Sequence, residues 1–158
     1  MPKDLEAELT SVLAIARLHR DRLEAALAHL GGRLPKTGEA VLAMTHDDVA
    51  NVELLLSRFG KLQDLLGARV FRLVAERTAE PLPPTATFLD LLHRLERIGA
   101  IPSAAGWRRL REIRNDLAHD YPDDPEATAA SLAEVVAAVP ELQAVDDTVR
   151  AHLARVGA

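Results

Sequence analysis

The sequence predicts an all-α protein, an antiparallel bundle of four to five helices that forms one domain over residues 1–158. Apolar residues recur at alternating steps of three and four over long stretches, which is the spacing of one helical face. The chain contains only one Trp, one Tyr and three Phe, and Leu, Ala and Val dominate its apolar content. The aromatic and β-branched enrichment typical of strands is therefore missing, and we expect helices around an aliphatic core.

The first predicted helix extends from about residue 5 to residue 30. Its apolar face consists of side chains at helical spacing, namely Leu5, Leu9, Val12, Ala16, His19, Leu23, Ala26 and Leu30. Gly31 and Gly32 can adopt the left-handed conformation that ends a helix, and Pro35 disfavours its continuation. We expect a loop over residues 31–44, and we interpret His19 as a core or interface histidine.

A second long helix is predicted from residue 46 to about residue 76. Thr45 and Asp48 form a capping signal, and an apolar stripe follows through Val49, Val52, Leu55, Phe59, Leu62, Leu66 and Leu73. Gly60 and Gly67 each cost about 1 kcal/mol relative to Ala inside a helix, so we expect a bend or a close helix contact there. This helix also carries a polar cluster that consists of Arg58, Lys61, Gln63 and Asp64. We expect the cluster to face solvent, and a cleft or a second subunit are the alternatives.

A short third helix is predicted after the Pro-rich segment 80–84. Thr87 and Asp90 form its capping signal, and Gly99 ends it. Ser103 can cap a fourth helix, which carries the apolar residues Trp107, Leu110, Ile113 and Leu117.

The fourth helix is expected to stop near Tyr121, because Pro122 disfavours helical geometry in the residue before it. Asp124 and Pro125 then form a capping residue and a first helical position for the fifth helix. This helix continues to the end of the chain, and we expect Pro140 to kink or break it.

Composition restricts the function classes. The net charge of −5 argues against broad, sequence-independent binding of nucleic acid, so contacts with RNA must be local. The absence of Cys removes disulfides and thiol chemistry and fits a reducing compartment, so we expect a cytoplasmic protein. No run approaches the ~20 apolar residues of a membrane span. His46 and His93 lack partners at metal-ligand spacing, and we predict neither a metal site nor a cofactor.

The informative segment is residues 108–122, RRLREIRNDLAHDYP, which gathers arginine, amide, carboxylate, imidazole and phenol groups. On one regular helix Arg114 and His119 would lie about 140° apart, so they do not converge on one ligand. Either the helix ends between them, or the same segment of a second subunit faces the first across a two-fold axis.

The stretch from Arg114 to His119, RNDLAH, resembles the signature of the HEPN superfamily, in which Arg, a polar residue, three further residues and His follow one another. The following His-Asp-Tyr, which ends at Tyr121, is similar to the His-any-Tyr extension of HepT-type toxins. The resemblance covers the motif helix closely and the remaining chain by architecture alone. It implies a four- or five-helix bundle of HEPN type, in which a homodimer lines one cleft with both motifs.

The resemblance also implies a metal-independent endoribonuclease toxin that is paired with a minimal nucleotidyltransferase antitoxin. Arg114 and His119 would be the catalytic pair. A histidine with a pKa near 6.5 can act as general base or acid at neutral pH. Arginine can bind a phosphate through two parallel hydrogen bonds and stabilise developing negative charge.

Five further residues receive roles from the same resemblance and from their position in the segment. Asn115 and Asp116 are expected to support the catalytic pair. Arg108 and Arg111 are expected to extend the RNA-binding track. Tyr121 is the candidate acceptor of an adenylyl group from the antitoxin, which would place a charged phosphate beside the cleft and block RNA.

Two other interpretations stay open. The chain is alternatively a non-catalytic HEPN protein that binds nucleotides or serves as accessory subunit of a nucleotidyltransferase; the presence of both Arg114 and His119 favours the enzyme. A purely structural bundle would leave Arg114 as a surface ion pair with Glu112, Asp116 or Asp120. In that case His119 caps helix carbonyls, Tyr121 is a packing residue, and Arg108 and Arg111 belong to a solvated face.

Overall fold

The computed structural model describes residues 3–78, 81–117 and 123–157, and these residues form helices and connecting segments without a strand. The prediction of an all-α protein is thus confirmed. The helices are α1 (Lys3–Leu30), α2 (Gly38–Leu42), α3 (His46–Leu65), α4 (Phe71–Arg77), α5 (Phe88–Arg97), α6 (Ala104–Asp116) and α7 (Pro125–Val156). A short 3-10 helix, η1 (Gly31–Arg33), follows α1, and a π-helical segment, η2 (Leu66–Val70), joins α3 to α4 without interruption.

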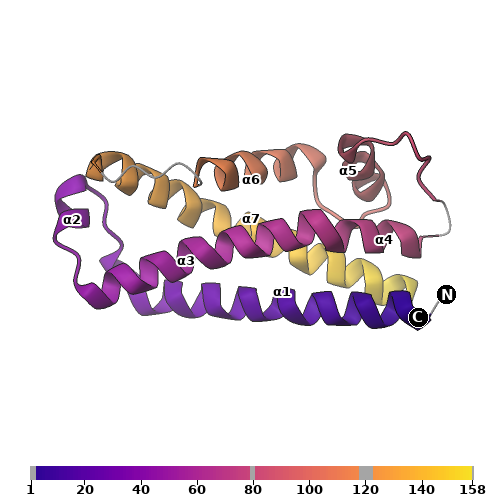
Figure 1. Cartoon of the computed structure of the whole chain (residues 1–158), viewed down its shortest axis with the longest axis horizontal. Helices are drawn as coiled ribbons and strands as arrows, with labels where there is room; N and C mark the ends of the chain where they lie inside the picture. The colour runs from indigo at the N-terminus through magenta and orange to yellow at the C-terminus, as the bar shows by residue number, and fades with distance from the viewer. Residues whose placement is uncertain (1–2, 79–80, 118–122, 158) are drawn as a thin grey trace.

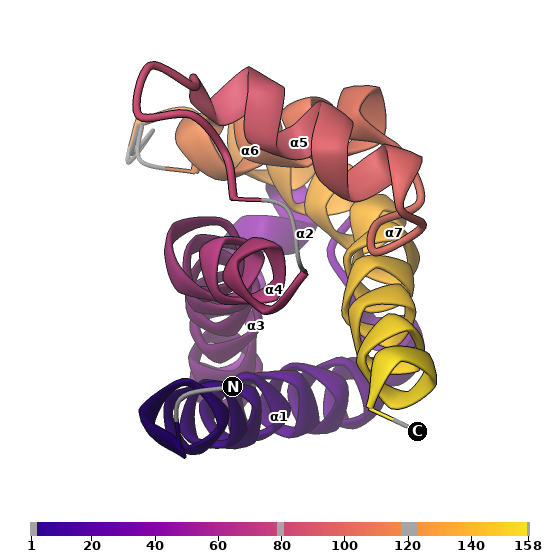
Figure 2. The same cartoon turned by 90° about the vertical axis from the view of Figure 1, so that its right-hand side faces the viewer.

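Four long rods surround one hydrophobic core (Figures 1 and 2). The rods are α1, the continuous α3–η2–α4 unit, α6 and α7, and α5 lies across one end of the bundle. Seen along the bundle, α3–α4 and α7 lie on opposite sides, while α1 and the α5–α6 pair close the other two sides. The largest fully buried side chains come from α1, α3, α4, α5, α6, η2 and the segment between α5 and α6, and include Leu23, Phe59, Leu66, Phe71, Leu92 and Trp107.

The predicted helix starts are confirmed by hydrogen bonds that backbone N–H groups of the first turn donate to capping side chains. Such caps stabilise a helix by about 1 kcal/mol each because they satisfy otherwise unpaired backbone N–H groups. The capping residues are Thr45 for α3, Thr87 for α5, Ser103 for α6 and Asp124 for α7. Gly31 and Gly99 have φ angles of +50° and +75°, the left-handed conformation expected at these two helix ends.

The expectation of a loop throughout residues 31–44 is wrong, because α2 forms within it. Thr37 caps this short helix by accepting a hydrogen bond from the N–H of Ala40. The N–H of Gly38 donates to the carboxylate of Glu126 in the first turn of α7, at 2.6 Å. A contact across the fold therefore stabilises a helical turn that local periodicity does not reveal.

Two predicted helix ends also need correction. α7 continues through Pro140 as one helix, so of the expected kink or break the break does not occur. Pro140 is exposed while Val139 and Leu142 are buried, so packing on the inner side favours the continuous helix and solvent can bind the carbonyl left unpaired. α6 ends at Asp116, before the expected stop near Tyr121, and Leu117 is its C-cap residue.

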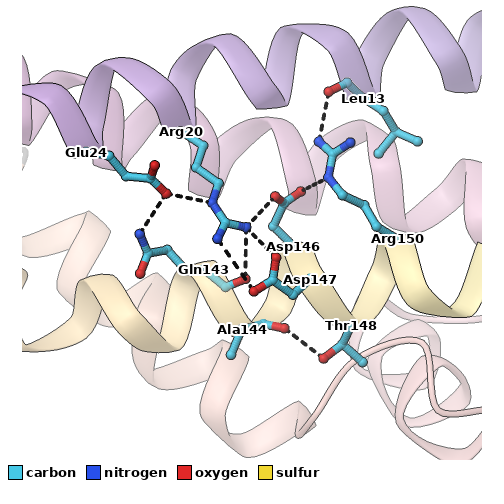
Figure 3. A network of polar contacts seen from close by, with 9 residues as sticks. All are labelled: Leu13, Arg20, Glu24, Gln143, Ala144, Asp146, Asp147, Thr148 and Arg150. Atoms are coloured by element: carbon cyan, nitrogen blue, oxygen red, sulfur yellow. Dashed lines mark hydrogen bonds and ion pairs between the residues drawn. The ribbon is translucent and has the colours of Figure 1, made fainter.

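A network of charged side chains joins α1 to α7 (Figure 3). Asp146 is fully buried, and its carboxylate accepts hydrogen bonds from Arg20 at 2.9 Å and from Arg150 at 3.0 Å. Arg20 also contacts Glu24 and Asp147, and Arg150 donates to the backbone oxygen of Leu13. The buried carboxylate therefore has two cationic partners, as a charge inside a protein requires.

α7 is long and apolar enough to cross a membrane by length and composition alone, with a mean hydropathy of 1.2 in its most apolar window. In the bundle 39% of that window is buried, and the core helix of a soluble protein has the same properties. A cytoplasmic location stays a prediction.

Candidate functional site

A groove of about 650 Å³ lies between the α3–η2–α4 unit and the pair α5 and α6. The residues that line it on the first side are Gln63, Asp64, Gly67, Ala68 and Arg72. Those on the second side are Phe88, Leu89, Leu91, Leu92, Arg108, Arg111 and Asn115. The volume is within the range of small-molecule sites, and apolar and polar groups both contribute to the walls.

The groove carries local positive charge in a chain that is negative overall. Arg72, Arg108 and Arg111 line it and are exposed. Within the part of the chain that the structure describes, no acid lies within ion-pair distance of these three arginines. Their charge is thus available for an anionic ligand, and Arg108 and Arg111 lie in one groove as an RNA-binding role requires.

Arg114 lies in the last turn of α6, next to this groove, and contacts the one acid that lines it. Its Nε and Nη2 atoms donate to both carboxylate oxygens of Asp64 on α3, at 2.9 to 3.3 Å. Of the expected local partners of Arg114, Glu112 and Asp116 make no ion pair with it, and Asp120 lies outside the described residues. The exposed fractions of the Arg114 and Asp64 side chains are 31% and 54%, so the pair is weak, at about 0 to 1 kcal/mol, and exchangeable.

Gly60 on α3 allows Arg114 to lie across the helix. A Cβ atom at position 60 would lie 2.9 Å from Nε and 3.1 Å from Cδ of Arg114, which is too close. Arg114 therefore also lines a second, smaller depression, together with Leu56, Ser57, Gly60, Lys61 and Leu117. The close helix contact predicted at Gly60 is confirmed, and its partner is the predicted catalytic arginine.

The second glycine, Gly67, lies in the π-helical segment η2. A Cβ atom there would lie 2.9 Å from Cζ2 of Trp107, whose ring packs edge-on against Phe71. π-helical turns occur often at functional sites, because the extra residue per turn changes the direction of neighbouring side chains. Here η2 forms part of the groove wall, with Gly67 and Ala68 in the lining.

The remaining predicted site residues are only partly described. Asn115 lines the groove, whereas Asp116 is exposed beside it. His119 and Tyr121 lie outside the described residues. α6 ends at Asp116, between Arg114 and His119, as one of the two alternatives for bringing them together requires.

His19 and Arg58 connect α1 and α3 away from the groove. Arg58 donates to Nδ1 of His19 at 2.8 Å, so this nitrogen accepts and the ring carries its proton on Nε2. Burial lowers the pKa of His19, and the nearby Arg58, Lys61 and Arg22 lower it further. His19 is half-buried and bonded, consistent with the interpretation of it as a structural histidine.

His29, Asp47 and Asp48 are the group of potential metal ligands in the described part of the chain, with ligand atoms within 4.8 Å of one another. His29 and Asp47 already contact each other at 2.7 Å, and the guanidinium of Arg33 binds Asp48 at 3.3 Å. A cation there would have to displace Arg33, and we assign no metal to the group.

Comparison with family models gives no match. Comparisons with curated proteins and with solved structures give no significant match either. The functional interpretation therefore depends on the residues themselves.

Sequence reasoning did not identify Arg72 and Phe88 as groove residues, and it noted Gln63 and Asp64 only as part of a polar cluster. One signal was available for Gln63. It follows Phe59 by four residues and precedes Leu66 by three, so an amide occupies a position of the apolar stripe. The other residues become neighbours only when α5 and α6 pack on α3.

Proposed function

We propose that the chain is a metal-independent endoribonuclease of HEPN type, with Arg114 and His119 as catalytic pair. The observation that carries the proposal is the position of Arg114, at the end of α6 and beside a groove with three arginines that have no ion pair among the described residues. Such a groove favours a polyanionic ligand. The positive charge of the groove is local, because the chain as a whole carries a net charge of −5.

The chemistry uses the ribose of the substrate as nucleophile. His119 removes the proton of the 2′-hydroxyl, the 2′-oxygen forms a bond to phosphorus, and the bond from phosphorus to the 5′-oxygen breaks. The departing 5′-oxygen takes up a proton from water, and His119 releases its proton to the solvent, so the products carry a 2′,3′-cyclic phosphate and a 5′-hydroxyl. Arg114 stabilises the negative charge that develops on the phosphate oxygens.

Arg114 must exchange Asp64 for the substrate phosphate in this mechanism. Its pair with Asp64 is half-exposed and held only by side chains, which supports such an exchange. Asn115 and Asp116 lie next to Arg114 in sequence and are proposed to orient the catalytic groups. Arg108 and Arg111 are proposed to extend the RNA-binding surface beside Arg114.

The proposal includes the regulation that the resemblance implies. The chain acts in the cytoplasm as a homodimer, and a cognate nucleotidyltransferase antitoxin adenylylates Tyr121 to stop RNA binding. Coexpression with the antitoxin should add the mass of one or more adenylyl groups to the wild type and none to Tyr121→Phe. An unmodified wild-type chain would contradict this part of the proposal but would not contradict the proposed nuclease activity.

The deciding experiment is bacterial growth after induced expression of the wild type, His119→Ala and Arg114→Ala, with RNA analysis of the same cultures. Growth arrest and RNA fragments are expected for the wild type only, and fragments should form equally in the presence of a metal chelator. Arg109→Ala is the matched control, since Arg109 lies on the same helix but forms an ion pair with Glu141 of α7. This control should remain toxic.

Binding without RNA cleavage would identify the alternative function. A soluble, dimeric wild type that binds RNA or nucleotides but produces no fragments would be a non-catalytic binding subunit. Fragments that persist in both His119→Ala and Arg114→Ala would show that the segment is incidental to the activity.

A further inference from the structure

The groove contains a buried amide that the proposed cleavage chemistry does not use. Gln63 is only 3% exposed, yet it is one of the residues that line the groove. Among the described residues no group forms a hydrogen bond with this amide, and its atoms are not among the fully enclosed ones. The amide therefore keeps a donor and an acceptor that are available to a ligand in the groove.

The chemistry of an amide narrows the class of ligand. It offers a hydrogen-bond donor and an acceptor side by side, which matches the edge of a nucleobase. The edges of bases are accessible in single-stranded RNA, where unpaired bases can turn out of the chain. A phosphate, by contrast, would use only the donor.

The opposite wall provides a flat surface for a base. The guanidinium of Arg111 lies over the ring of Phe88, with 5.2 Å between its central carbon and the ring centroid, and both residues line the groove. Aromatic rings and guanidinium planes are the two surfaces on which unpaired bases stack in RNA-binding proteins. Arg72 and Arg108 are exposed beside this pair, on opposite sides of the groove.

We infer that the groove is a base-recognition subsite, which takes one unpaired nucleobase of single-stranded RNA. Gln63 reads the edge of the base, Arg111 on Phe88 stacks against its face, and Arg72 and Arg108 bind the flanking phosphates. The inference deepens the proposed function, because it names what selects the RNA segment presented to Arg114. It does not require cleavage.

The test is binding of short fluorescent oligomers of A, of C and of U to the full chain, measured by anisotropy at constant salt. The wild type should prefer one of the three bases, and Gln63→Leu should lose roughly tenfold in affinity for that oligomer and bind all three alike. Gln143→Leu is the matched control, because Gln143 is the other glutamine of the chain and lies on α7, hydrogen-bonded to Glu24. It should keep the preference of the wild type.

A second variant protects the test against a folding defect at the buried position. Arg72 is exposed, and Arg72→Gln should weaken the binding of all three oligomers several-fold while the base preference remains. Arg17→Gln, on the exposed side of α1, should change neither the affinity nor the preference. Equal binding of the three oligomers by the wild type, or an unchanged preference in a folded Gln63→Leu, would overturn the inference.

Different experimental outcomes would overturn the base-recognition subsite and the proposed nuclease function. Selective binding that depends on Gln63, without any RNA fragments in cells, would support the subsite and overturn the nuclease. RNA fragments that depend on His119 and are cut at the same positions by Gln63→Leu would support the nuclease and overturn the subsite.

Discussion

Arg114, the proposed catalytic arginine, illustrates how one ion pair can orient a side chain and still be exchanged for another partner. Asp64 binds both Nε and Nη2 of the guanidinium, which directs Arg114 toward the groove edge. The same carboxylate competes with any phosphate for these donors. The side chains of both residues are partly exposed, so water reduces the attraction and a substrate can replace Asp64.

Removal of this competitor should strengthen RNA binding. In Asp64→Asn the amide keeps the size of the side chain but removes its negative charge, so we expect RNA affinity to rise by up to about fivefold. Anisotropy with the oligomer that the wild type prefers measures the change, and Asp47→Asn, on the same helix but paired with His29, serves as control. Weaker binding by Asp64→Asn would mean that Asp64 positions Arg114 for the substrate.

A second residue gives the protein a predictable pH dependence. His152 on α7 is 5% exposed, and its Nε2 has no hydrogen-bond partner among the described residues. Burial lowers the pKa of His152, and Arg155 and Arg77 lower it further. The unfolded chain, in which this histidine titrates near 6.5, therefore binds a proton more readily than the folded chain.

Stability should consequently be full above about pH 6.5 and decline as the pH falls below it. His19 contributes with the same sign, since its pKa is also lowered. Chemical denaturation at several pH values between neutrality and pH 5 measures the slope, and His152→Leu should flatten it. An identical slope in the variant would show that His152 is not desolvated in the folded protein.

At the scale of the helices, two glycines in one rod have different functions. Gly60 in α3 faces the flexible side chain of Arg114, whereas Gly67 in η2 faces the buried ring of Trp107. A methyl group at position 60 can move a side chain that is partly in solvent. At position 67 it would meet a ring that the core confines.

The substitutions Gly60→Ala and Gly67→Ala should therefore separate activity from stability. Both gain about 1 kcal/mol of helix propensity. At position 67 crowding outweighs this gain, and we expect a net loss of about 1 to 2 kcal/mol in the free energy of unfolding. At position 60 stability should change by less than about 1 kcal/mol, but displacement of Arg114 should reduce RNA cleavage.

Thermal unfolding and RNA cleavage of the two variants provide the comparison. Loss of stability in Gly60→Ala equal to that in Gly67→Ala would show that Arg114 is as confined as Trp107. Full cleavage by a stable Gly60→Ala would show that the position of Arg114 across α3 is unimportant.

At the scale of the whole molecule, the α1–α7 network links the two longest helices through a buried charge (Figure 3). Removal of the Asp146 carboxylate would leave Arg20 and Arg150 without their common partner in a site that excludes water. Breaking a buried pair from one side is strongly destabilising for this reason.

We expect Asp146→Ala to lower the free energy of unfolding by about 3 kcal/mol. Asp147→Ala is the matched control, because Asp147 also binds Arg20 but its side chain is 62% exposed, and its loss should cost less than about 1 kcal/mol. Denaturant unfolding of both variants distinguishes them. Equal stabilities would indicate that Arg20 and Arg150 find other partners without a penalty.

The sequence alone determined the class of the fold and most helix boundaries, because the signals that set them are local. Thr45, Thr87, Ser103 and Asp124 bond to backbone groups within three residues, and Gly99 needs only its own φ angle. The segment of α6 with Arg108, Arg111 and Arg114 was likewise recognisable from its composition.

Tertiary structure decided what no local pattern contains. The bond from the N–H of Gly38 to Glu126 in α7 stabilises α2 beyond its local cap, and buried residues on both sides of Pro140 pack against the bundle and keep α7 continuous. Arg114 binds Asp64, fifty residues away, rather than Glu112 or Asp116 in its own segment. The groove and its Gln63 depend on the packing of α5 and α6 against α3 and η2. Such contacts join residues that are distant in the chain, and their energies appear only when the helices pack together.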